Sequence, residues 1–285
     1  MKRYVDLHIH SCDSDSTMTP EEIMAEIKRQ GVKLCSITDH NILKAGFYDP
    51  DGDVTVLPGA EIDAIYDGVN IHILGFGCDV DNENLQGLCR NTREIMEDTN
   101  RRLIHQLAQE FPQINEEEYE DYTYDRRLGG WKTLHYMIEK GLAKNTDECF
   151  PYYVRYGNLY NQTPFETAEV VIHAIHDARG KALLAHGGYT FRQRTDEEIV
   201  EVVKGLQALG LDGAECYYPL HTKSQQEKLL AYCRKEGLLI SAGNDCHGTF
   251  QPETINQIKV CEDQISCDAL KALLHTTLEL PYNNV

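Results

Sequence analysis

Short apolar runs alternate with longer amphipathic stretches along this chain of 285 residues. The apolar runs are rich in Val, Ile and Leu and show little strict polar alternation, which is typical of strands buried on both faces of a parallel sheet. They predict strands over residues 4–8, 33–38, 54–65, 69–75, 181–185, 211–216 and 238–242.

The stretches between these runs carry the start and stop signals of helices. Thr19-Pro20-Glu21-Glu22 combines an N-cap threonine, a proline at the first helical position and a glutamate that can close a capping box. Further helices are predicted over residues 164–179, 195–209 and 222–236, each followed by a glycine and an apolar run. This repetition indicates an α/β fold and favours one β/α barrel over two unrelated domains.

The alternation stops between residues 82 and 163, where no convincing strand is found. Residues 84–111 predict one long helix and residues 134–142 a shorter one. We interpret this region as a helical insertion packed over the mouth of the barrel. The predicted domains are therefore a barrel formed by residues 1–81 and 164–285, and an insertion subdomain formed by residues 82–163.

Composition limits the classes of partner. No apolar stretch approaches the ~20 residues that cross a bilayer, and the N-terminus lacks the apolar core of a signal peptide, which predicts a cytoplasmic protein without a membrane partner. The net charge of −19 argues against stable binding to long nucleic-acid duplexes, because such proteins carry a basic surface. A small phosphorylated substrate remains compatible with this charge, since bound metal ions can reverse the local sign.

Histidines and acidic residues stand at the ends of most predicted strands. His8 and His10 are two positions apart on one strand, so their side chains point to the same side and could chelate one ion. Any single residue of this kind is more often an ordinary buried histidine or a helix-capping carboxylate. Coincidence does not explain the whole set, because most predicted strands would each have to place such a residue at the same end. In β/α barrels that end is where active sites are built. The set is His8, His10, Asp15, His40, Glu61, His72, His186, Asp245 and His247.

So many imidazole and carboxylate ligands exceed what one ion needs, and they indicate a multinuclear metal-dependent hydrolase. The order of the motifs resembles the PHP (polymerase and histidinol phosphatase) family of metal-dependent phosphoesterases along the whole chain. This resemblance implies a distorted (β/α)7 barrel with a helical insertion and a trinuclear metal site. The matching segments are residues 6–10, 14–15, 37–41, 58–62, 72–75, 184–186, 213–219 and 243–248.

The resemblance also implies how the ligands divide. The first ion would take His8, His10, Glu61 and Asp245, the second Glu61, His72 and His186, and the third Asp15, His40 and His247. Mixed nitrogen and oxygen ligands favour Mn²⁺, Fe²⁺ or Zn²⁺ over Mg²⁺ or Ca²⁺. The predicted nucleophile is a water that bridges metal ions and is held through Glu61 and Asp245, and no serine or cysteine nucleophile motif is found.

Residues 210–222 and the position of the insertion resemble the branch of this family that acts on nucleoside 3′,5′-bisphosphates and short oligonucleotides. In that branch, a histidine after Tyr-Tyr-Pro contacts substrate phosphate, which makes His221 a candidate. Arg192 and Arg194 follow His186 and could clamp a phosphate bidentately. The competing interpretations are a solvent-facing neighbour of a helix cap for His221 and an ordinary surface loop for the two arginines.

The chain departs from that branch where the branch carries Gly-Arg-Pro-His, since Gly129-Gly130-Trp131-Lys132 stands there instead. Trp131 could stack on a base and Lys132 could supply a positive charge. We expect hydrolysis of a phosphomonoester on a small nucleotide, such as a 3′,5′-bisphosphate or a short oligonucleotide. The alternatives are a histidinol-phosphate phosphatase, which the insertion and the Tyr-Tyr-Pro-x-His segment disfavour, and a non-catalytic metal-binding module, which the complete ligand set disfavours.

Overall fold

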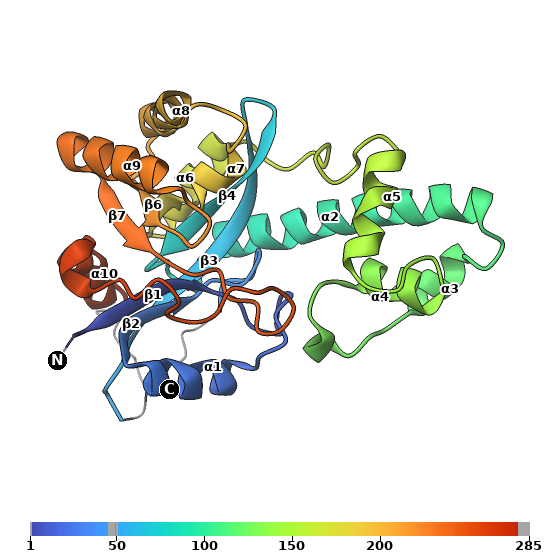
Figure 1. The fold of residues 1–285 in the computed structure, drawn as a ribbon, viewed down its shortest axis with the longest axis horizontal. Coiled ribbons are helices and arrows are strands. Elements are labelled where there is room, and N and C mark those ends of the chain that lie inside the picture. The colour runs from blue at the N-terminus through green and yellow to red at the C-terminus, as the bar shows by residue number, and fades with distance from the viewer. Residues whose placement is uncertain (1, 45–48, 50, 279–285) are drawn as a thin grey trace.

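The computed structural model describes residues 2–44, 49 and 51–278. Its described part is a mixed α/β fold around one seven-stranded sheet whose strands lie in chain order (Figure 1). This confirms the predicted fold class. The strands are β1 (Tyr4–Ile9), β2 (Val32–Ile37), β3 (Thr55–Tyr66), β4 (Val69–Phe76), β5 (Lys181–Leu184), β6 (Gly213–Tyr217) and β7 (Leu239–Ala242).

The expectation of a parallel sheet is wrong for one strand, because β4 runs antiparallel to both β3 and β5. Only Asp67 and Gly68 connect β3 to β4, and their φ angles are 52° and 70°. Two left-handed residues form a tight hairpin turn, whereas parallel neighbours need a crossover of about a dozen residues or more. The remaining neighbouring strands are parallel.

The sheet closes on itself where β1 meets the segment that follows β7. The backbone N–H of Asp245 donates to the carbonyl of His8 at 2.8 Å, and the N–H of His10 donates to the carbonyl of Cys246 at 3.0 Å. These bonds bring the beginning and the end of the barrel together at the end of β1 that carries its histidines.

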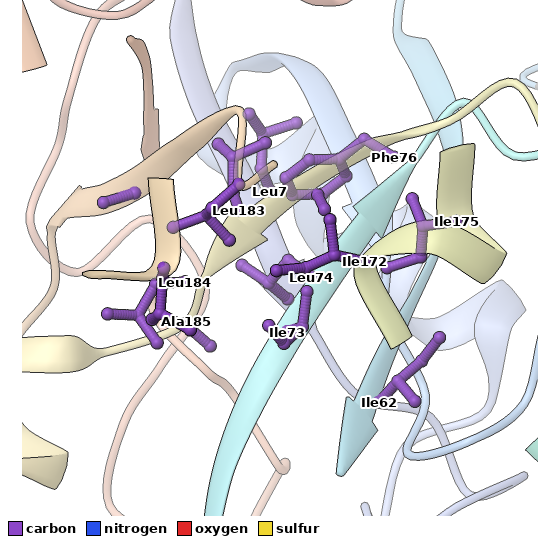
Figure 2. Packing of buried hydrophobic residues seen from close by; sticks show 14 of the residues in the cluster. Leu7, Ile62, Ile73, Leu74, Phe76, Ile172, Ile175, Leu183, Leu184 and Ala185 are labelled. Carbon is purple, nitrogen blue, oxygen red and sulfur yellow. The ribbon is translucent and has the colours of Figure 1, made fainter. Parts of the chain in front are cut away.

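The strands and the helices that cover them share one apolar core. Leu7 of β1, Phe76 of β4 and Leu183 of β5 are buried together, with Ile172 and Ile175 of helix α6 (Ala168–Asp177) packed nearby (Figure 2). Burying apolar surface of this kind is the main favourable contribution to folding. The polar residues of the candidate site therefore sit on a rigid apolar base.

The helices predicted between strands are present, with small shifts at their ends. Helix α1 (Pro20–Gln30) has the predicted capping box between Thr19 and Glu22, and Gly31 ends it at φ 73°. None of the helices in the described ranges is both long and apolar enough to span a membrane. The other elements around the barrel are α7 (Gly187–Thr190), α8 (Asp196–Ala208), α9 (Lys223–Glu236), η3 (Glu262–Gln264) and α10 (Cys267–Leu278).

Residues 82–163 are helical and contain no strand. Helix α2 (Glu83–Glu110) is shared, since Leu85 joins the barrel core while Leu107 joins a second apolar cluster formed within this region. Its far half and the other elements lie to one side of the sheet (Figure 1). The other elements of residues 82–163 are α3 (Glu116–Asp121), η1 (Arg126–Leu128), α4 (Lys132–Glu139), η2 (Asp147–Cys149) and α5 (Phe150–Arg155). The division into a barrel and an insertion subdomain stays a prediction.

Candidate metal centre

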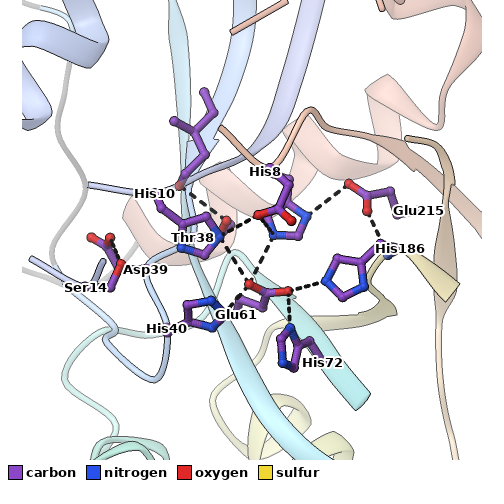
Figure 3. Close-up of polar contacts among 12 residues, drawn as sticks. His8, His10, Ser14, Thr38, Asp39, His40, Glu61, His72, His186 and Glu215 are labelled. Carbon is purple, nitrogen blue, oxygen red and sulfur yellow. Dashed lines mark hydrogen bonds and ion pairs between the residues drawn. The ribbon is translucent and has the colours of Figure 1, made fainter. Parts of the chain in front are cut away.

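The residues predicted to bind metal come together in one cluster in which all but the half-buried His40 and His72 are buried, and much of it is drawn in Figure 3. His8 lies on β1, while His186 lies two residues after β5 and Asp245 follows β7. Glu61 and His72 were expected at strand ends, but they lie within β3 and β4. The antiparallel pairing of these two strands continues past the cluster to the hairpin turn, which explains the difference.

A first group of ligand atoms surrounds one point. The Nε2 atoms of His8 and His10 each lie 3.2 Å from Oε2 of Glu61, and 3.3 Å and 3.1 Å from Oδ1 of Asp245. These four atoms are buried and have no hydrogen-bond partner among the residues that the structure describes. Two ligand atoms about 2.1 Å from the same ion are roughly 3.0–3.4 Å apart in octahedral or tetrahedral geometry. The spacing and the unpaired atoms fit one shared cation.

A second group lies around Asp15. Its Oδ1 is 3.3 Å from Nε2 of His247 and 3.6 Å from Nδ1 of His10, and its Oδ2 is 3.8 Å from Nε2 of His40. The rings of His10 and His247 stack with their centroids 4.1 Å apart. His10 therefore presents one ring nitrogen to each group, whereas the resemblance placed it with the first ion alone.

Glu61 stands between the first group and a third one. Its Oε1 lies 2.8 Å from Nδ1 of His72 and 2.9 Å from Nε2 of His186, while its Oε2 faces His8 and His10. One carboxylate thus offers an oxygen to each of two histidine groups. This is the geometry that a bridging carboxylate requires, and the bridging role itself stays a prediction.

The charges in the cluster stabilise one another. Burial alone would raise the pKa of Glu61, but the imidazoles of His8 and His72 hold that pKa well below its usual range. Burial likewise opposes charge on His10, yet the carboxylates of Asp245 and Glu61 beside it raise its pKa to about 10. The carboxylates are therefore kept ionised, which is the state that cation binding needs.

Further acidic residues outside the predicted ligand set orient the histidines. Nδ1–H of His8 donates to Oε1 of Glu215 at 3.1 Å, and the other Glu215 oxygen accepts the backbone N–H of His186 at 2.8 Å. Asp63 lies 3.1 Å from Nε2 of His72 in the same way. Such contacts fix the tautomer and leave the opposite nitrogen free for an ion. The i, i+2 spacing of Glu61 and Asp63 on one strand was a usable signal.

Two predicted ligands have unusual backbone conformations. His186 and Asp245 have φ angles of 30° and 54°, which non-glycine residues seldom adopt. The contact of Glu215 with the His186 N–H and the bond between the Asp245 N–H and His8 hold these conformations in place. Strain of this kind persists where the surrounding structure over-determines it, often at functional sites.

His221 lies under the loop that follows His186. Its Nε2 accepts the N–H of Gly188 at 3.0 Å, and its Nδ1–H donates to the carbonyl of Cys216 at 3.2 Å. Burial lowers the pKa of His221, which favours the neutral ring that both bonds require. These contacts give His221 a role in holding the loop, and its contact with substrate phosphate stays a prediction.

The other predicted substrate contacts are not among the clustered ligands. Arg192 is exposed, with its guanidinium 4.5 Å from the ring centroid of Tyr189, and Arg194 pairs with Asp67 at 2.9 Å. Nε1–H of Trp131 donates to the hydroxyl of Tyr153 at 3.0 Å. Lys132 pairs with Glu97 at 3.0 Å. Roles of these four residues in substrate binding stay predictions.

Comparison with curated proteins finds relatives along nearly the whole chain. A 5′-3′ exoribonuclease of Haemophilus influenzae is 24% identical over 255 residues, covering 87% of this chain and 91% of the relative. A phosphoribosyl 1,2-cyclic phosphate 1,2-diphosphodiesterase of Eggerthella lenta is 27% identical over 263 residues, covering 86% and 94%. A 3′,5′-nucleoside bisphosphate phosphatase of Chromobacterium violaceum is 24% identical over 249 residues, covering 85% and 87%.

Among solved structures, one described as a metal-dependent phosphoesterase of Bifidobacterium adolescentis superposes with a TM-score of 0.77 at 25% identity, covering 98% of both chains. No family model matches the chain. The fold, the clustered ligands and these relatives define the chain as a hydrolase of the metal-dependent phosphoesterase class. These relatives act on phosphate esters, which agrees with the phosphoesterase resemblance drawn from the motifs.

Replacing Glu215 with Gln is expected to weaken metal binding or turnover by roughly 10- to 100-fold, as is usual for residues that orient a ligand. The amide keeps only one acceptor oxygen, so either His8 or the His186 N–H loses its partner. Metal titration of the purified variant measures the effect. Glu227→Gln on the exposed face of α9 is the matched control. Wild-type metal affinity in Glu215→Gln would show that Glu215 does not orient these ligands.

Proposed function

We propose that this chain hydrolyses a phosphomonoester of a small nucleotide, with nucleoside 3′,5′-bisphosphates or short oligonucleotides as the substrate class. The observation that carries the proposal is Glu61, whose two oxygens face separate histidine groups inside a buried cluster. The relatives support the substrate class, since the names of two of them specify RNA or a nucleoside bisphosphate. The cytoplasmic location and the lack of stable duplex binding remain predictions.

The ligand atoms suit three divalent transition-metal ions, with Mn²⁺, Fe²⁺ and Zn²⁺ as candidates. When bound, such ions would supply Lewis acidity and would lower the pKa of a bound water, so that it is deprotonated and nucleophilic toward phosphorus near neutral pH. The first ion would be held by His8, His10, Glu61 and Asp245, the second by Glu61, His72 and His186, and the third by Asp15, His40 and His247.

The remaining polar residues prepare these ligands. Glu215 and Asp63 set the orientation of His8 and His72, and the hydroxyl of Tyr218 donates to Oδ2 of Asp245 at 3.1 Å. The bonds to His8 and His72 occupy the ring nitrogen that does not face Glu61. The bond to Asp245 occupies its second carboxylate oxygen. The chain therefore holds the ligand atoms in place before any ion or substrate arrives, which reduces the reorganisation that binding and reaction require.

A substrate panel tests this function. We expect chelation to abolish turnover, and reloading with Mn²⁺, Fe²⁺ or Zn²⁺ to restore phosphate release from adenosine 3′,5′-bisphosphate. The panel also contains short oligoribonucleotides and histidinol phosphate, and elemental analysis gives the metal content of each sample. Turnover of histidinol phosphate alone would support that phosphatase instead. A fully loaded protein that is inactive on every ester would support a non-catalytic module.

A further inference from the structure

The loop that carries Asp15 is held from two sides. On the barrel side, the N–H and the hydroxyl of Ser11 donate to the carboxylate of Asp39, both at 2.7 Å, and the hydroxyl of Ser14 donates to it at 2.6 Å. Figure 3 shows Ser14 against Asp39 beside the histidine cluster. The barrel therefore fixes the beginning of this loop.

Residues distant in sequence hold the end of the same loop. The N–H of Gly130 donates to the carbonyl of Asp15 at 2.7 Å. The guanidinium of Arg126 donates to the carbonyls of Asp13 and Ser14 at 2.5 Å and 3.1 Å. These contacts join the segment before α4 directly to the backbone of a predicted ligand.

This segment is itself held by its neighbours. The hydroxyl of Tyr124 donates to the carbonyl of Gly130 at 2.8 Å, and Nε2–H of His135 donates to the carbonyl of Gly129 at 2.7 Å. The rings of Tyr124 and His135 stack with a centroid distance of 4.6 Å. Two side chains thus lock the peptide units that approach Asp15.

Both glycines are required by close approach and by backbone conformation. Their φ angles are 71° and 65°, in the left-handed region that favours glycine. A Cβ at Gly129 would lie 2.6 Å from Cβ of Phe250 and 3.0 Å from the carbonyl oxygen of Asp15. Phe250 follows His247 closely, and their rings are 6.4 Å apart. The segment therefore contacts two of the chain segments that supply ligands to the Asp15 group, those of Asp15 and His247.

We propose that residues 124–135 position Asp15 and His247 for one metal ion, so that this region is part of the metal centre as well as a wall above it. The proposal rests on the ligand groups given under the proposed function. Arg126 is a positioning residue in this arrangement, because its guanidinium donates to the backbone carbonyls of Asp13 and Ser14 in the ligand loop. Loss of these contacts weakens the binding of the ion at Asp15 and leaves the binding of ions at the other ligand groups unchanged.

The test is Arg126→Ala in the full chain, with metal bound after dialysis measured by elemental analysis and titration. We expect one ion to bind about tenfold more weakly, in line with other residues that orient ligands. Arg126→Lys keeps a donor and should restore binding. Arg155→Ala removes an exposed arginine that pairs with Glu110 elsewhere in the region, and should leave metal content unchanged. Electron paramagnetic resonance of the Mn²⁺-loaded variants gives a second readout that does not depend on turnover.

Asp15→Ala separates the failure of this inference from that of the proposed function. If Asp15→Ala retains its full metal content, the ligand assignment is wrong and the proposed function loses its support. If Asp15→Ala loses one ion while Arg126→Ala and Gly130→Ala retain it at wild-type affinity, only the positioning role is overturned. Thermal unfolding of each variant identifies general loss of structure, and Arg126 is exposed, so its truncation should leave the unfolding midpoint unchanged.

Discussion

Glu61→Gln is expected to lower phosphoester turnover by more than roughly 100-fold and to reduce metal content at two ligand groups. The loss of turnover should exceed the roughly 10- to 100-fold loss that is usual for a residue that only orients a ligand. The carboxylate faces His8 and His10 with one oxygen and His72 and His186 with the other. The amide has nearly the same shape, so it removes the charge and one acceptor without leaving a cavity. A two-sided loss of metal is the signature of a bridging ligand.

Elemental analysis and turnover are measured on the same preparation of Glu61→Gln. Glu201→Gln on an exposed turn of α8 is the matched control and should behave like the wild type. Removing a carboxylate from among buried imidazoles can also destabilise the protein, so the unfolding midpoint is recorded in parallel. A Glu61→Gln protein with full metal content and full turnover would show that Glu61 is not a metal ligand and that the candidate metal centre is wrongly assigned.

Gly243→Ala is expected to destabilise the protein by roughly 1–3 kcal/mol, which is typical of overpacking, and to disrupt the first ligand group. An added Cβ would lie 2.1 Å from Cβ of His8 and 2.6 Å from Oε1 of Glu215. The backbone N–H of His8 would be only 2.8 Å from it, so small side-chain adjustments cannot relieve the clash. His8 or the segment after β7 must move, and either movement separates His8 from Asp245.

Urea unfolding and metal titration of Gly243→Ala measure both effects. Gly87→Ala makes the same change in α2, where the nearest atom to the new Cβ is the end of the Arg90 side chain at 3.9 Å. That control should be neutral or slightly stabilising, because alanine restricts the unfolded chain more than glycine does. Wild-type stability and metal affinity in Gly243→Ala would contradict the tight packing of this glycine against His8.

Much of this architecture could be predicted from local sequence patterns. Helix α1 follows from its capping box and terminal glycine, and the apolar runs locate every strand to within a few residues. The direction of β4 was missed although Asp67-Gly68 is a standard hairpin signal between two apolar runs. Continuous apolar runs cannot distinguish a parallel strand from a buried antiparallel one, and the turn should have taken precedence.

The candidate metal centre likewise contains residues that local sequence patterns predict and contacts that they do not. His8 and His10 were found from their spacing on one strand, which is a local property. The contact of Arg126 with Asp13 and Ser14 joins positions more than 100 residues apart, so no local pattern contains it. Base stacking by Trp131 stays a prediction, and the bond of its indole N–H to Tyr153 is a contact that only the tertiary structure reveals.

The closure of the barrel has a consequence for synthesis of the chain on the ribosome. His8 and His10 emerge more than 200 residues before Asp245, which follows β7 and pairs with the backbone of His8. A nascent chain that stops before this segment cannot assemble the first ligand group. The first ligand group can therefore form only after the segment that follows β7 has been translated, and products that end before Asp245 would lack it.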